Sequence, residues 1–122
     1  MNISERTIND VMVLDLEGNL VLEENVRFRK YVAGALDAGV RNLLVNLERV
    51  KYMDSSGLGE LISCYTALQQ LNGQIKLLHL NNHLQYLLAI TKLDSVFETF
   101  DSEPAAISSF AAPSESIENA AP

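Results

Sequence analysis

The sequence predicts an α/β fold in a single domain, with a mixed β-sheet of about five strands and about four helices. Two short segments that read as extended near the N-terminus are separated by the turn residues Asn9-Asp10, which is the pattern of a β-hairpin. Single apolar runs then alternate with segments in which apolar residues recur at helical spacing. Helical crossovers join parallel strands and a short turn joins antiparallel ones, so we expect the sheet to be mixed.

The length of 122 residues fits one domain with one hydrophobic core. We expect the domain to cover residues 1–110, because residues 111–122 are mostly Ala, Pro, Ser and Glu and predict a disordered C-terminal tail. The net charge of -7 argues against direct nucleic-acid binding, which requires clustered Lys and Arg. The sequence shows neither a signal peptide nor an apolar run of about 20 residues, so we expect a cytoplasmic protein without a membrane span.

In the first half of the chain, the pattern predicts a strand that ends at Ile8, a second strand from Val11 to Leu16 and a helix from Glu23 to Ala38. The second strand is apolar on both faces, which indicates a central position in the sheet. Gly39 suits the C-terminal end of the helix. The residues of this helix expected to face the core are Phe28, Val32, Ala35 and Leu36.

The second half predicts three more strands, at Leu43–Leu47, Gln74–Leu80 and Val96–Phe100. A long helix follows the first of these strands, and a short helix capped by Asn81 or Asn82 follows the second. Residues 102–104 open a final helix, in which a proline is tolerated in the first turn. The residues expected to face the core are Leu58, Leu61, Ile62, Tyr65, Leu68, Ile75, Leu77, His79, Leu84, Leu87, Leu88, Thr91, Ile107 and Phe110.

The start of the long helix carries two hydroxyl groups and a carboxylate. Asp54, Ser55 and Ser56 occupy its N-cap region, where oxygen side chains accept hydrogen bonds from unpaired backbone N–H groups. Gly57 and Gly59 leave the first turn bare, so the backbone of a partner could approach closely. The positive end of the helix dipole would favour a phosphate on a serine at this position. From the residues alone, an ordinary capped helix and a phosphorylation site both fit the pattern.

Residues 51–59, Lys-Tyr-Met-Asp-Ser-Ser-Gly-Leu-Gly, resemble the phosphorylation-site signature of the STAS domain family, the anti-sigma factor antagonists of bacteria. The resemblance extends from about Asn2 to Phe110 and implies a single STAS-like domain. It also implies partner switching, in which the unphosphorylated antagonist binds an anti-sigma factor that is also a serine kinase and so frees the sigma factor. Phosphorylation ends that binding, and a Ser/Thr phosphatase restores it. By this resemblance, Ser56 is the phosphoacceptor.

The exposed side of the long helix is the expected docking surface for the partner. We expect Gly59, Glu60, Ser63 and Thr66 to lie there. Asp54 has two interpretations, because it either caps the helix or, by the resemblance, holds the loop and helps the kinase to present Ser56. Ser55 is interpreted as a structural hydroxyl. The full set of expected partner-binding residues is Asp54, Ser55, Ser56, Gly57, Gly59, Glu60 and Ser63.

Enzymatic alternatives find less support in the sequence. A serine hydrolase would need Gly-x-Ser-x-Gly between a strand and a helix, and here Met53 or Asp54 stands at the first glycine position. His79 and His83 have helical ligand spacing, but they straddle a predicted strand end and a cap. Cys64 is distant from both in the sequence and is expected to be a semi-buried thiol. We therefore expect no enzyme, no metal site and no cofactor.

Two positions depart from the pattern of the family. Family members often carry an aspartate in a Gly-x-Leu-Asp turn, where this chain has Val21, and another at the end of the strand before the motif, where this chain has Asn46. A second hypothesis is therefore a STAS scaffold or adaptor without a switch, in a signalling complex or a transporter system. A neighbouring gene for a small anti-sigma serine kinase would favour the antagonist, and genes for transporter subunits would favour the adaptor.

Overall fold

The computed structural model describes residues 1–110 of the protein. The strands in this part are β1 (Asn2–Ile8), β2 (Val11–Glu17), β3 (Asn42–Arg49), β4 (Gln74–Leu78) and β5 (Thr99–Phe100). They form one sheet in this same order. β1 pairs antiparallel with β2, and the other neighbours pair in parallel. The predicted mixed sheet is therefore confirmed, with the second strand inside it.

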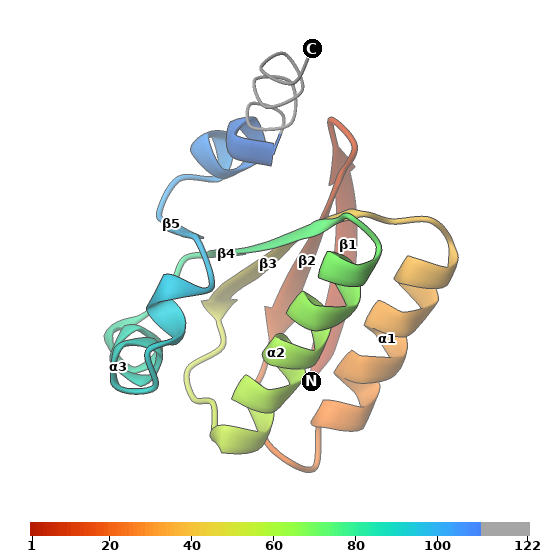
Figure 1. The fold of residues 1–122 in the computed structure, drawn as a ribbon. Coiled ribbons are helices and arrows are strands. Elements are labelled where there is room, and N and C mark those ends of the chain that lie inside the picture. Colours follow the sequence, from red (N-terminus) through yellow and green to blue (C-terminus); the bar gives the residue numbers. More distant parts are fainter. Residues whose placement is uncertain (111–122) are drawn as a thin grey trace.

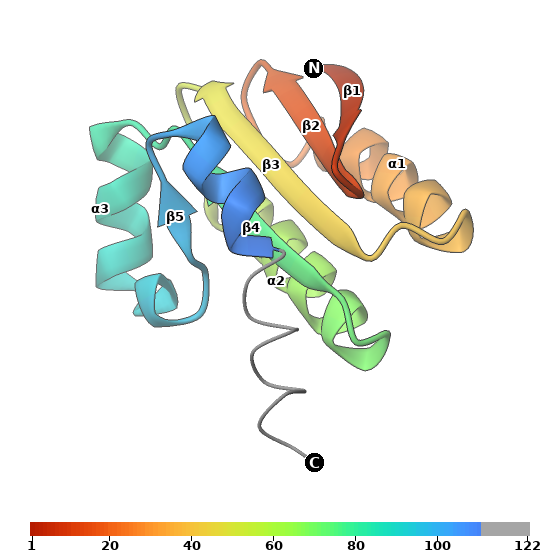
Figure 2. The ribbon, with the colours of Figure 1, turned by 90° about the horizontal axis from the view of Figure 1, so that it is seen from above.

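α1 (Asn25–Asp37) and α2 (Ser55–Gln70) lie side by side on one face of the sheet (Figure 1). α3 (Asn82–Ile90) flanks β5, and residues 103–110 form a helix that packs on the opposite face (Figure 2). A short 3-10 turn, η1 (Leu93–Ser95), leads from α3 towards β5. The described residues thus contain the α/β fold that the sequence predicts. The expected tail, residues 111–122, lies outside them.

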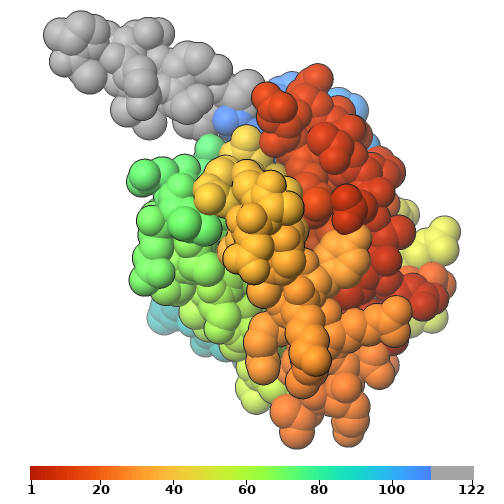
Figure 3. Space-filling model, turned by 90° about the vertical axis from the view of Figure 1, so that its right-hand side faces the viewer, coloured from red at the N-terminus to blue at the C-terminus, as the bar shows by residue number. Residues whose placement is uncertain are grey.

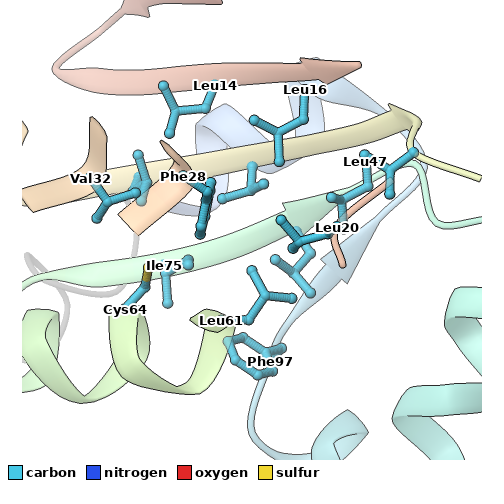
Figure 4. Packing of buried hydrophobic residues seen from close by; sticks show 14 of the residues in the cluster. Leu14, Leu16, Leu20, Phe28, Val32, Leu47, Leu61, Cys64, Ile75 and Phe97 are labelled. Atoms are coloured by element: carbon cyan, nitrogen blue, oxygen red, sulfur yellow. The ribbon is translucent and has the colours of Figure 1, made fainter. Parts of the chain in front are cut away.

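The main hydrophobic core fills the space between the sheet and α1, α2 and α3 (Figure 4). Its fully buried side chains include Leu14 of β2, Phe28 of α1 and Leu61 of α2. A smaller cluster packs the opposite face of the sheet against the last helix and contains Val11, Val13, Leu44, Leu78, Ala106, Ile107 and Phe110. β2 contributes to both clusters, which explains why both of its faces are apolar.

Among the apolar residues predicted to face the core, α2 differs from the prediction at Ile62. Gly57, Leu61, Cys64 and Leu68 form a buried line along the helix. Ile62, which was expected in this line, is 40% exposed. One residue along an α-helix corresponds to a rotation of about 100°, so Ile62 points well away from the direction of its neighbour Leu61. The expectation for Ile62 was therefore wrong, and Cys64, which was expected to be semi-buried, is only 5% exposed and belongs to the main core.

Three further expectations were wrong at the ends of elements. His79 lies beyond the end of β4 and adopts a left-handed backbone with φ of 60°. Thr91 is exposed at the C-terminal end of α3, where its hydroxyl donates to the carbonyl of Leu87 at 2.6 Å. Val96 is exposed and precedes β5, whereas its neighbour Phe97 is buried in the main core. At each of these points the chain turns towards the next element, and the side chains no longer follow the period of the element.

Candidate functional site

Asp54 caps α2, as one of its two sequence interpretations predicts. Its backbone is extended, and its carboxylate accepts hydrogen bonds from the N–H groups of Ser56 and Gly57, each at 3.0 Å. These bonds satisfy donors that would otherwise be unpaired at the start of the helix. The Ser56 hydroxyl, followed by the N–H groups of Gly57, Ser56 and Leu22, lowers the pKa of Asp54. Asp54 is therefore a carboxylate at neutral pH.

Ser56 makes two side-chain contacts at the N-terminus of α2. Its hydroxyl donates to Oδ1 of Asp54 and accepts a hydrogen bond from Nδ2 of Asn25 at 2.6 Å. Asn25 is the first residue of α1 and is only 2% exposed. Its own Oδ1 is buried and has no hydrogen-bond partner among the described residues. The two helices therefore meet at the serine that the family resemblance singles out.

Asn25 is a site residue that the sequence reasoning missed. The available signal was its position three residues before Phe28, which places it on the core-facing side of the helix together with Val32 and Ala35. α1 begins at Asn25, two residues after the predicted start, because the N–H groups of Glu24 and Asn25 both bond to the carbonyl of Val21 in a preceding turn.

The two glycines of the motif have different roles. A Cβ atom on Gly57 would lie 2.3 Å from the carbonyl oxygen of Leu20 and 2.7 Å from Cγ of Met53. Gly57 therefore lets the chain around Leu20 pack directly against the start of α2, and it is buried. The expectation that Gly57 is bare to a partner was wrong, because a segment of the same chain occupies that space. Gly59 is exposed, and a Cβ atom on it would meet nothing within 4 Å.

Glu60 lies between the two helices and not on the exposed side of α2. The residue is 8% exposed, and its carboxylate accepts hydrogen bonds from the guanidinium group of Arg29 in α1. The expected exposure of Glu60 was therefore wrong, because α1 packs against this side of α2 and supplies a partner. Ser63 and Thr66 are exposed as expected, and Ser55, which was interpreted as a structural hydroxyl, is exposed as well. Figure 3 shows α1 running between the surfaces of β1 and α2.

The two positions that depart from the family pattern do not share one surface. Asn46 donates to Oδ1 of Asp15 at 2.8 Å, and Asp15 in turn binds Arg6. Asn46 follows Leu44 by two residues on β3 and so belongs to the face of the sheet opposite α1 and α2. Val21 lies on the Ser56 side, in the turn before α1. A side chain at position 46 therefore lies on the face of the sheet opposite α1 and α2, away from Ser56.

The serine hydrolase and the metal site find no support in the arrangement of side chains within residues 1–110. The side-chain partners of Ser56 are Asn25 and Asp54, and His83 instead stacks on Tyr52 with ring centroids 5.0 Å apart. Burial raises the pKa of the Cys64 thiol to about 12, so it is not a thiolate at neutral pH. Within residues 1–110, no group of three or more His, Cys, Asp and Glu side chains is placed to hold a metal ion. No helix in this part is long and apolar enough to cross a membrane.

Comparison with known proteins agrees with this fold and motif. BtrV of Bordetella bronchiseptica, a proposed anti-sigma factor antagonist, is 24% identical over 110 residues, which are 90% of this chain and 95% of BtrV. A proposed anti-sigma factor antagonist of Thermotoga maritima has a crystal structure with a TM-score of 0.85 at 23% identity, covering 88% of this chain and 93% of its own. The Bacillus cell fate determinant SpoIIAA in its phosphorylated form has a TM-score of 0.71 at 22% identity, covering 88% and 97%. The model of the STAS domain matches residues 2–106, and the chain therefore belongs to the STAS domain family.

Proposed function

We propose that this protein is an anti-sigma factor antagonist that is switched by phosphorylation of Ser56. Unphosphorylated, it binds an anti-sigma factor that is also a serine kinase, and phosphorylated it releases that partner until a Ser/Thr phosphatase acts. The observation that carries the proposal is the position of the Ser56 hydroxyl, at the N-terminus of α2 and directly beside the Asp54 carboxylate. Relatives that are described as anti-sigma factor antagonists support the same function. Both partners would act in the cytoplasm.

The charge change at Ser56 explains how phosphorylation would end binding. In the reaction, Ser56 Oγ forms a bond to the γ-phosphorus of ATP, the bond from that phosphorus to ADP breaks, and the hydroxyl proton is released. The product carries about -1.5 to -2 charges at neutral pH. The positive end of the α2 dipole favours a phosphate there, so we expect the fold to tolerate it. A partner fitted to a neutral hydroxyl would have to desolvate this charge.

The contact area for the partner is the Ser56 surface, which we define as the exposed or half-exposed residues Leu22, Val26, Ser55, Ser56, Gly59 and Ser63. Leu22 is 69% exposed and its N–H group contributes to the environment of Asp54, which places it beside the phosphorylation site. Val26 is 47% exposed and follows Asn25, the residue that contacts Ser56. Exposed apolar side chains around a small polar centre are typical of an interaction surface.

The test is a phosphorylation assay with the anti-sigma serine kinase encoded in the same genome. The kinase and Mg-ATP are incubated with the wild-type protein, with Ser56→Ala and with Ser55→Ala as the matched control, and the phosphate is located by peptide mass spectrometry. We expect phosphate on the wild type and on Ser55→Ala, and none on Ser56→Ala. A phosphate on Ser55 would refute the assignment. A kinase that binds the protein but transfers no phosphate would favour the scaffold or adaptor function.

A further inference from the structure

The Asn25 side chain is polar although its position is buried. An apolar side chain at this position would have no atom that needs a hydrogen-bond partner. It is almost completely buried and its Oδ1 has no partner among the described residues, while Nδ2 donates to Ser56 Oγ. A buried polar atom without a partner destabilises the fold. Leucine, whose side chain has the same branched shape, would avoid that cost at this core-facing position of α1. The amide is therefore best explained by what its N–H group does at Ser56.

The two neighbours of Ser56 respond differently to a phosphate on Oγ. The Asp54 carboxylate only accepts hydrogen bonds, so it loses its bond from the hydroxyl once that proton is gone, and it then faces a second anion. The Asn25 amide donates, so it can form a hydrogen bond to an oxygen atom of residue 56 both before and after phosphorylation. Asp54 thus favours the unphosphorylated serine, whereas Asn25 is compatible with both states.

We propose that Asn25 is a positioning residue for phosphoserine 56, which keeps its Nδ2–H group on the oxygen atoms of the phosphoserine and holds the phosphate against the start of α1. The inference rests on the proposed function, since it concerns the same serine. Asp54 is the charged group in contact with Ser56, and the nearest ion pair between the helices, Arg29 with Glu60, lies one helical turn further along α2. A donor on the phosphate lowers its proton affinity, and the adjacent carboxylate raises it.

The experiment measures the ionisation of phosphoserine by 31P NMR as a function of pH. Phosphoserine is incorporated genetically at position 56, so that no kinase is needed, in the wild-type background and with Asn25→Leu or Asn25→Asp. Phosphoserine at position 55 is the matched control, because Ser55 is exposed and the Asn25 amide donates to Ser56 instead. Loss of the donor should raise the proton affinity of phosphoserine 56 about tenfold in Asn25→Leu, which corresponds to one hydrogen bond to a charged group. The increase should be larger in Asn25→Asp, and the control should not change.

Two outcomes would overturn the inference. The first is that phosphoserine 56 ionises at the same pH in the wild-type background and in the Asn25 variants. A merely structural residue would change stability and leave the ionisation of the phosphate unaffected. The second needs no variant of Asn25: in the otherwise unchanged protein, the 15N and 1H resonances of its side-chain amide should shift with the same midpoint as the phosphate, and constant resonances would contradict the contact. Neither result depends on a kinase, so a failed phosphorylation assay would refute the proposed function separately.

Discussion

Arg29 of α1 and Glu60 of α2 form an ion pair whose two members differ greatly in burial. The Arg29 side chain is 60% exposed, whereas the Glu60 side chain is 10% exposed. Removing one partner of such a pair has unequal consequences, because an exposed guanidinium regains water and a buried carboxylate does not. The pair therefore links α1 to α2 mainly because Arg29 supplies hydrogen-bond donors to the buried Glu60 carboxylate.

This asymmetry predicts that replacing the base is more harmful than replacing the acid. Arg29→Met should lower the urea midpoint of unfolding more than Glu60→Gln, since the first leaves a buried carboxylate unpaired and the second leaves an amide oxygen that still accepts from Arg29. Lys30→Met is the matched control, because Lys30 is exposed on the same helix. Equal midpoints for Arg29→Met and Lys30→Met would show that the pair contributes nothing to stability.

The two motif glycines should respond in opposite directions to alanine. Gly57→Ala should destabilise the protein by about 1–3 kcal/mol or more, because the new methyl group would overlap the Leu20 carbonyl. Gly59→Ala should stabilise it by about 0.5–1 kcal/mol, because the position is open and alanine favours a helix. Thermal unfolding of both variants followed by circular dichroism measures the difference. A loss of stability in Gly59→Ala would mean that the site contains a contact absent from this structure.

The neighbours Leu61 and Ile62 test the orientation of α2. Leu61→Ala should destabilise by about 2–5 kcal/mol, because it opens a cavity in the main core. Ile62→Ala should change the free energy of unfolding by about 0.5 kcal/mol or less, because its side chain is partly in solvent. Urea unfolding gives both values. Similar costs for the two variants would show that the helix faces are assigned incorrectly.

The order of strands and helices was predictable because it depends on local periodicity. The predicted core side of α1 is correct for Phe28, Val32 and Ala35, which are all buried. The cap by Asp54 was also predictable, since the carboxylate and the N–H groups that it binds are separated by only two and three residues. Each of these features can be recognised in a short segment of sequence.

The contacts between α1 and α2 were not predictable in the same way. Asn25 meets Ser56, and Arg29 meets Glu60, across 31 residues in each case. Which sides of two neighbouring helices face each other depends on how both pack on the sheet, and the period of a single helix does not contain this information. A glutamate on a helix is normally expected in water, so its burial becomes understandable only with the arginine in place.

The Ser56 hydroxyl should have separate effects on stability and on binding. Ser56→Ala removes the only hydrogen-bond partner of the buried Asn25 amide among the described residues, so it should destabilise by about 1–3 kcal/mol, yet the protein should still bind the anti-sigma kinase. Ser56→Asp should fold but bind at least tenfold more weakly, because its carboxylate adds a charge beside Asp54 on the Ser56 surface. Isothermal titration calorimetry with the kinase and without ATP measures the affinity, and urea unfolding measures the stability. Unchanged affinity of Ser56→Asp would contradict the switch, since a partner that accepts a carboxylate at this position has no evident reason to reject a phosphate.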